Sequence, residues 1–162
     1  MKNAEVLGKL EDLTMLEMAG LAGVKLSYAL TCNAKLIGEE ANKIKGALKY
    51  PKAYEELREK YRKLFQEHAK KDQKGNLIVQ DNKYVLDPEK KDAYDKLVAE
   101  EEKASKAIIE EAQAVEEEYK NFLQEEATLS GKIVTIKLEH LPETITPAQM
   151  AALSFMIEEL QN

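Results

Sequence analysis

The sequence contains one cysteine, Cys32, and no tryptophan. A single cysteine cannot form a disulfide within the chain, so the fold does not depend on an oxidising compartment and we expect a cytoplasmic protein. No histidine lies near Cys32 in the sequence, so we interpret it as a small buried apolar residue rather than a nucleophile.

Long hydrophobic runs are also missing. No segment approaches the roughly 20 apolar residues that a membrane-spanning helix needs. The first turns carry Glu5, Glu11 and Asp12 in an amphipathic pattern instead of the apolar centre of a signal peptide. We therefore expect no membrane association.

Motifs that carry chemistry are absent as well: there is no glycine-rich phosphate loop, no Cys or His pair with zinc spacing and no Glu-x-x-His pair. Residues 72 to 75 resemble the start of a calcium loop, but they lack the alternating oxygen ligands and the closing Glu. The glutamate runs at 100 to 102 and 116 to 118 indicate a solvated helix face. We predict a protein that is not an enzyme, with no catalytic, cofactor-binding or metal-binding residues.

Aromatic residues make up only 6% of the chain, whereas 33% of the residues are charged. A core of Leu, Ile and Ala favours helices packed on helices over a sandwich or barrel. The length predicts a single domain over residues 1 to 162. The fold class that we predict is mainly α: an antiparallel, coiled-coil-like hairpin of long helices with a small β-hairpin, one further strand and a C-terminal helix.

The first half of the chain predicts two helical segments. Residues 1 to 24 hold an amphipathic helix and a glycine-containing turn, and residues 25 to 74 form a first arm with a break near Pro51. Asn33 lies in the apolar seam of this arm, where it either sets the register or marks the edge of the stripe. The apolar stripes are Leu26, Leu30, Ile37 and Ile44 before the break, and Tyr54, Leu57, Tyr61, Leu64 and His68 after it.

Residues 75 to 87 interrupt the helical pattern and predict a β-hairpin. Apolar residues alternate on both sides of Asp81-Asn82, two residue types that tolerate the conformation of a two-residue turn. Asp87 and Pro88 then predict the start of a second, acidic arm over residues 88 to 127 without a break. Its predicted seam is Tyr94, Leu97, Glu101, Ala104, Ile108, Ala112, Val115, Tyr119 and Phe122.

The two arms differ in charge. Residues 43 to 74 carry 11 basic and 5 acidic groups, whereas residues 87 to 126 carry 6 basic and 14 acidic groups. Antiparallel folding would lay the basic arm along the acidic one. Because exposed ion pairs are weak, we expect this contrast to fix partner and register more than stability.

Residues 132 to 162 predict a strand followed by a capped helix. The strand covers residues 133 to 138, which are β-branched and alternating, and its pairing partner is open. The helix starts with a capping box at Thr146 and Gln149 and with Pro147 at its first position. Its broad apolar face indicates core or, alternatively, a surface for a protein partner; the candidate partner-binding residues are Met150, Leu153, Phe155, Met156, Ile157 and Leu160.

Two histidines remain. His68 continues the seam of the first arm, and we interpret it as a partly buried residue that is bonded to a neighbouring side chain. His140 follows the predicted strand, and we interpret it as a surface histidine. No second His or Cys lies near His140 in the sequence.

An ordered set of segments resembles a family of uncharacterised phage and prophage proteins, from about Lys25 onward. The segments are YEELR (54 to 58), KKDQKGN (70 to 76), DNKYVL (81 to 86), IKL (136 to 138), LP (141 to 142) and ITPAQMAAL (145 to 153). The family has no assigned activity. The resemblance therefore implies a phage setting, with the host cell cytoplasm as location, and no site residues.

These observations favour a non-enzymatic helical module that binds or inhibits a protein partner, either a host factor or a phage assembly component. One alternative is a nucleic-acid-directed protein that uses the basic residues 43 to 74. Another is an acidic DNA mimic that uses residues 88 to 126. The long seams predict a homo-oligomer, with a dimer as the simplest form. No cofactor is expected.

Overall fold

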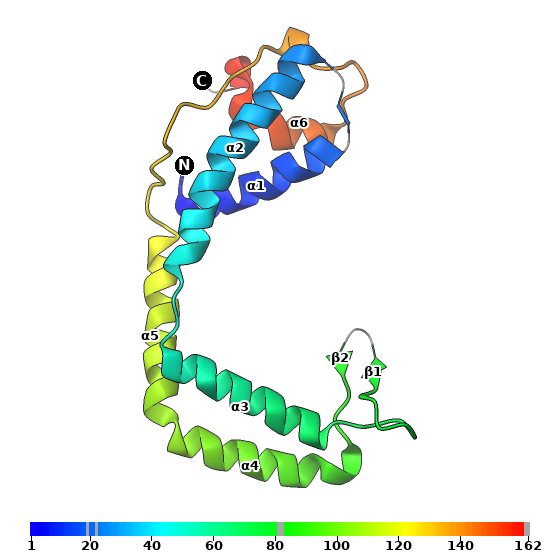
Figure 1. Ribbon diagram of the computed structural model, residues 1–162. Coiled ribbons are helices and arrows are strands. Elements are labelled where there is room, and N and C mark those ends of the chain that lie inside the picture. The colour runs from blue at the N-terminus through cyan, green and yellow to red at the C-terminus, as the bar shows by residue number, and fades with distance from the viewer. Residues whose placement is uncertain (19, 22, 81–82, 161–162) are drawn as a thin grey trace. The chain divides into compact units, whose positions relative to one another are not determined.

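The structure is a computed structural model that describes residues 1–18, 20–21, 23–80 and 83–160 (Figure 1). It is mainly helical, with a small antiparallel two-stranded sheet, as the sequence predicts. The helices and strands are α1 (Asn3–Met18), α2 (Val24–Ala47), α3 (Lys52–His68), β1 (Val79–Gln80), β2 (Lys83–Tyr84), α4 (Lys91–Ala104), α5 (Lys106–Phe122) and α6 (Pro147–Leu153). Short 3₁₀ turns cover Pro88–Lys90, Leu138–His140, Ser154–Met156 and Glu158–Leu160.

The chain divides into two compact units, which we describe one at a time. Unit 1 contains Met1–Leu48 and Glu118–Asn162, and unit 2 contains Lys49–Glu117.

Unit 1 is built around the packing of α2 on α1 and on the C-terminal segment. The predicted stripe of α2 is buried, and it faces α1 and the C-terminal segment, although the sequence suggested that it would face the second arm. The apolar period of both helices puts their buried residues on one side. The buried cluster is Val6, Leu13, Leu16, Leu26, Ala29, Leu30, Ile37, Ala41, Ile44, Ile136, Leu153, Met156 and Ile157.

Asn33 lies fully buried in this core. Its side-chain amide donates to the carbonyl oxygen of Val134 over 2.9 Å, and its Oδ1 accepts the Val134 N–H over 2.8 Å. The amide thus pairs with one residue of the chain as a neighbouring strand would. Asn33 therefore sets the register between α2 and the segment around Val134, and the edge-of-stripe alternative is wrong.

The predicted strand at residues 133 to 138 is wrong as a regular strand. Only Ile136 forms a bridge there, an isolated parallel one with Ile157. Its N–H donates to Met156 over 2.8 Å, and its carbonyl oxygen accepts from Glu158 over 3.0 Å. The backbone groups of Val134 and Ile136 are thus paired with the Asn33 side chain and with the C-terminal segment, in place of a second strand.

The predicted capping box of α6 is confirmed. Thr146 Oγ1 accepts the Gln149 N–H, and the Gln149 side chain accepts the Thr146 N–H, with Pro147 at the first turn. The helix ends at Leu153, and 3₁₀ turns continue the chain, so the regular part of this helix is shorter than the sequence suggested.

Unit 2 contains α3 and α4, which lie side by side and antiparallel (Figure 1). The Tyr94 ring meets Phe65 edge-on at a centroid distance of 5.7 Å and lies 5.8 Å from the His68 ring. Lys60 and Glu101 form an ion pair between the two helices. The predicted antiparallel arrangement is confirmed for this part of the arms.

The predicted β-hairpin joins α3 to α4. Val79 pairs with Tyr84 and Gln80 with Lys83, and the expected turn residues 81 and 82 lie outside the described residues. At the base of the hairpin, the Lys70 N–H donates to Val85 and its carbonyl oxygen accepts the N–H of Ile78. The end of α3 is thereby hydrogen bonded to both halves of the hairpin.

The predicted second arm is not one continuous helix, because Ser105 interrupts it. The Ser105 N–H still donates to the Glu101 carbonyl oxygen over 2.8 Å, while its hydroxyl donates to the Glu101 carboxylate over 3.1 Å. The backbone of Ser105 has φ −103° and ψ 15°, which departs from the helical conformation. The regular helices here are α4 and α5, and α5 ends at Phe122 instead of near Glu126.

The buried positions of α4 also differ from the predicted seam of the second arm. Leu97 and Ala104 are exposed, and the half-buried or buried positions are Val98 and Ser105, one residue further along in each case. Tyr94, Glu101, Ile108, Ala112, Val115, Tyr119 and Phe122 are at least partly buried, as predicted.

Candidate functional site

The predicted partner-binding residues separate into core and surface. Leu153, Met156 and Ile157 are fully buried in unit 1, so a partner cannot reach them while the unit stays folded. Met150 and Phe155 are half-buried against the same core, and Lys9 Nζ lies 5.2 Å from the centre of the Phe155 ring. Leu160 is 51% exposed and is the most accessible member of the set.

A second apolar surface of unit 1 lies at the start of α2. Val24 and Tyr28 are one helical turn apart on the same side of α2, and they are 88% and 65% exposed. Tyr28 borders a hollow of about 220 Å³. We call Val24 together with the lining of this hollow the Tyr28 surface; the lining residues are Lys25, Tyr28, Val134, Thr135, Ile136, Lys137, His140 and Glu158.

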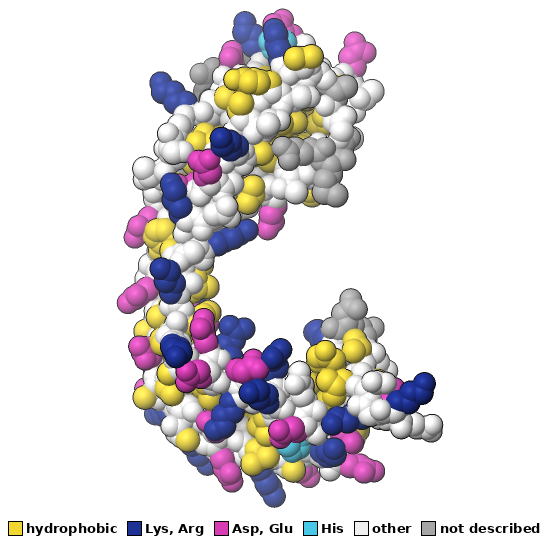
Figure 2. Space-filling view, viewed as in Figure 1, with side chains coloured by type: hydrophobic (Ala, Val, Ile, Leu, Met, Phe, Trp, Pro, Cys, Tyr) yellow, Lys and Arg dark blue, Asp and Glu magenta, His cyan; other side chains and the backbone are white. Residues whose placement is uncertain are grey.

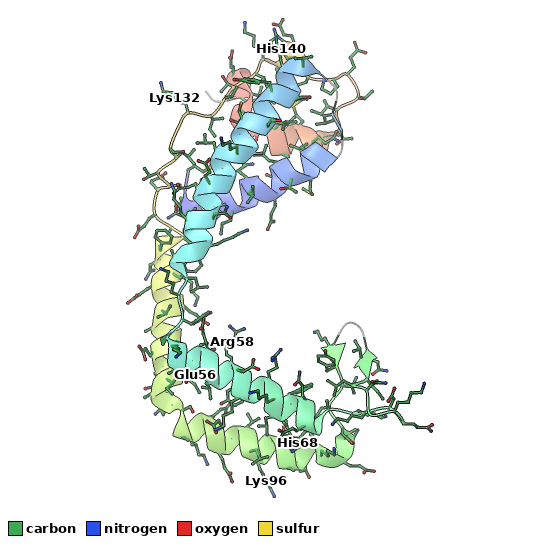
Figure 3. All side chains as sticks on the ribbon, viewed as in Figure 1. Glu56, Arg58, His68, Lys96, Lys132 and His140 are labelled. Carbon is green, nitrogen blue, oxygen red and sulfur yellow. The ribbon has the colours of Figure 1, made fainter. Side chains whose placement is uncertain are left out.

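Polar contacts fix the rim of the Tyr28 surface. Lys25 Nζ lies 2.6 Å from His140 Nε2, and Thr135 Oγ1 donates to Glu158 over 3.2 Å. Figure 3 shows His140 at the N-terminal end of α2. The His140 side chain is only 23% exposed, so the predicted surface histidine is a rim residue in contact with Lys25.

Cys32 and Tyr28 lie one turn apart on α2. Hydrogen bonding to the Cys32 thiol raises the pKa of the Tyr28 hydroxyl. Cys32 is half-buried, so it is less enclosed than the sequence suggested. A tyrosine on a surface, with an apolar ring and a polar end, is a residue type that is enriched in the centres of protein interfaces.

Unit 2 has little core of its own. Its buried residues in the described ranges are Leu57, Ala69, Ser105 and Ala112. Two packed helices leave much of their apolar surface in contact with water, because each helix has only one neighbour.

The hairpin of unit 2 exposes an apolar pair. Val79 and Tyr84 face each other across the two strands and are 54% and 50% exposed. Figure 2 shows apolar side chains gathered over this hairpin beside charged side chains of α3. Tyr84 lies close enough to Arg62 to contribute, after Glu59, to the raised pKa of that guanidinium.

The charges of α3 are mixed. Ion pairs within the helix join Lys52 to Glu56 and Arg62 to Glu59, and Figure 2 shows both signs along it. The basic excess of residues 43 to 74 is therefore interrupted by carboxylates on α3. A surface that tracks a phosphate backbone carries one sign of charge along a stripe, so this pattern suits a protein partner better.

The remaining candidates have structural contacts. His68 is half-buried, as its seam position predicts, but its Nδ1 lies 2.8 Å from the backbone carbonyl oxygen of Leu64 instead of contacting a neighbouring side chain. Both oxygens of Asp72 accept hydrogen bonds within residues 72 to 76, which lowers the pKa of this carboxyl. Across the described ranges, no group of His, Cys, Asp and Glu side chains is arranged to hold a metal ion.

Glu101 gives a pH-dependent prediction. The hydrogen bond from Lys60 holds the pKa of Glu101 below its usual value of 4.5, and Ser105 adds to the effect. A lowered pKa means that the contact stabilises the folded chain above about pH 4.5 and that this contribution is lost as the pH falls through the folded value. Glu101→Gln should therefore lower the melting temperature at neutral pH, and the difference from the wild type should shrink in acid.

The matched control for this prediction is Glu100→Gln, which changes an exposed neighbour on the same helix. Melting curves of both variants at several pH values provide the measurement. An equal effect of the two substitutions at all pH values would contradict the role given to the contact between Lys60 and Glu101.

Comparison with protein-family models, with curated proteins and with solved structures found no significant match to this chain. The resemblance to phage and prophage proteins is therefore still a prediction. In the described part of the chain, no helix combines the length and the apolar character that crossing a membrane requires.

Proposed function

We propose that this chain is a non-enzymatic helical protein-interaction module of a phage, which acts in the host cytoplasm by binding and inhibiting a host protein or by assisting phage assembly. The observation that supports it best is the Tyr28 surface: Val24 and Tyr28 are exposed at 88% and 65% beside a hollow with charged residues at its edge. Interfaces commonly have such an apolar centre and polar rim.

The charge of the rim suggests what the partner presents. Two lysines, Lys25 and Lys137, line the hollow together with the carboxylate of Glu158. A partner segment with an apolar side chain for the hollow and carboxylates for the rim complements this arrangement. The C-terminal segment contributes through Glu158, which directly follows the buried residue Ile157.

The test starts with affinity capture from the host by the whole protein, followed by titration of the purified partner. The double variant Val24→Ser, Tyr28→Ser should weaken binding by about tenfold or more, because truncation of a central aromatic residue removes a large share of interface energy. Leu97→Ser is the matched control, since Leu97 is an exposed apolar residue of α4 in unit 2.

Nucleic-acid binding is the competing outcome. Labelled duplex and single strands should show negligible affinity at physiological salt. A tight affinity that falls steeply with salt, and that is weakened by changing Lys43, Lys45, Lys49 and Lys52 together, would overturn the proposal. Equal loss of partner binding in the double variant and in Leu97→Ser would instead place the interface outside the Tyr28 surface.

A further inference from the structure

Only two of the 24 basic residues are arginines, Arg58 and Arg62, and both lie on α3. Together with Glu55 and Glu59 they occupy positions i, i+3, i+4 and i+7, which form one row along a helix. The same four side chains line one open hollow of about 400 Å³. We call these four residues the α3 charge row.

The α3 charge row points away from the packed side of α3. The buried Leu57 and the half-buried Tyr61 belong to the side that meets α4, and Figure 3 shows Arg58 on the opposite side. Glu55, Arg58 and Arg62 are exposed, and Glu59 is half-buried and accepts a 2.7 Å ion pair from Arg62. Arg58 Cζ lies 6.0 Å from the centre of the Tyr50 ring, and Glu55, Arg58 and Arg62 all remain exposed to another molecule.

The order of charges in the row is self-complementary. When a second α3 is laid antiparallel with the two-fold axis between residues 58 and 59, Glu55 faces Arg62 of the second copy and Arg58 faces its Glu59. Symmetry repeats both pairs, so every carboxylate meets a guanidinium. A parallel two-fold pairing in register would instead place like charges together, which is unfavourable.

We propose that the α3 charge row is a self-recognition surface through which two copies of the chain associate with antiparallel α3 helices. Arginine suits this role because its planar guanidinium pairs with a carboxylate through two parallel hydrogen bonds. The lysines of the chain provide point charges and lack this geometry. The partner that the row fits is thus a second copy of the same chain.

The hairpin supplies the apolar part of the same contact. Exposed ion pairs contribute little affinity but fix orientation, so burial of apolar surface must accompany them. Val79 and Tyr84 are half exposed, and their hairpin follows the C-terminal end of α3, which is the end of the row that holds Arg62. In the antiparallel pair this end meets the start of the second α3, so each hairpin flanks the first turn of the other helix.

The association uses unit 2, whereas the proposed partner surface lies in unit 1, so the two proposals can fail separately. The test is sedimentation velocity of the full chain at micromolar concentration, with circular dichroism to verify folding. Wild type should form dimers. Two double variants change the row. The acidic-row variant carries Arg58→Glu and Arg62→Glu, and the basic-row variant carries Glu55→Arg and Glu59→Arg. Each should weaken self-association by about 100-fold or more, because like charges then face each other.

Two recovery experiments separate charge recognition from damage to the fold. A mixture of the acidic-row and basic-row variants should form a heterodimer, and the variant with all four charges exchanged should again form a homodimer. The control exchanges Lys106 and Glu110, an exposed ion pair of the same kind on α5, and should leave the dimer unchanged. Monomeric wild type, or a dimer that is insensitive to the row, would overturn the proposal.

Discussion

Replacement of Asn33 by alanine should lower the free energy of unfolding of unit 1 by about 2 to 4 kcal/mol, because it leaves two partly buried backbone groups of residue 134 without their partner, at roughly 1 to 3 kcal/mol for each group that is fully buried. The side chain is fully buried and bonds to both the N–H and the carbonyl oxygen of Val134. The substitution removes both partners at once, and the small space left by the amide adds to the loss.

Hydrogen exchange measured by mass spectrometry, together with urea unfolding, provides the measurement. In Asn33→Ala, the amides around Val134 should exchange faster than in the wild type, since the Val134 N–H loses its acceptor. Asn42→Ala is the matched control, because Asn42 is an exposed asparagine on the same helix. An equally small effect of both substitutions would show that solvent replaces the Asn33 contacts at no cost.

The dependence on Asn33 explains why the segment at residues 133 to 138 was predicted as a strand. Its β-branched residues alternate as in a strand, and this pattern predicts an extended backbone. The pattern does not show which groups pair with the backbone of this segment. In the structure these groups are the Asn33 side chain of α2 and a bridge to Ile157. Pairing by a side chain over 101 residues of separation cannot be inferred from local periodicity.

Elements that depend on neighbouring residues were predicted well. The register of the hairpin follows from alternation on both sides of a two-residue turn, and the structure pairs Val79 with Tyr84 as expected. The capping box of α6 depends only on Thr146 and Gln149, three residues apart. Both features are settled within a few residues of chain, so the sequence suffices for them.

The break at Ser105 shows the limit of periodicity in a long helical pattern. Residues 91 to 122 contain no Gly or Pro, so composition predicts a continuous helix. The interruption lies at Ser105, where the hydroxyl donates to the Glu101 carboxylate, and Lys60 of α3 pairs with the same carboxylate. A change of seam from Leu97 to Val98 accompanies it, and only tertiary contact selects between adjacent apolar residues.

The candidate site was predicted only in part, because an apolar face looks the same in sequence whether it enters a core or binds a partner. Leu153, Met156 and Ile157 belong to the core, whereas Leu160 is accessible. The Tyr28 surface was not predicted. Tyr28 and Val24 are apolar residues that lie off the apolar stripe of α2, and this position in the sequence could have indicated that they are exposed. The α3 charge row was also present in the sequence as Glu55, Arg58, Glu59 and Arg62.

Substitution of Leu153 by alanine should destabilise unit 1 by about 2 to 5 kcal/mol, the range for removal of a fully buried leucine side chain that leaves a cavity. Leu153 is 0% exposed and packs within the cluster that includes Leu13 and Leu26. Leu160→Ala should change stability by only about 0.5 kcal/mol or less, because this side chain is 51% exposed.

Urea unfolding of both variants, combined with titration of the captured partner, distinguishes core from interface among the predicted partner-binding residues. If Leu153 acts only through the core, its substitution should weaken partner binding solely in proportion to the fraction of unfolded protein, and the affinity of the folded protein should be unchanged. A leucine that contacts the partner directly would show the reverse pattern: near-normal stability with a large loss of affinity at low urea. That result for Leu153→Ala would require α6 to leave the core when the partner binds, and it would contradict the assignment of this face to the core of unit 1.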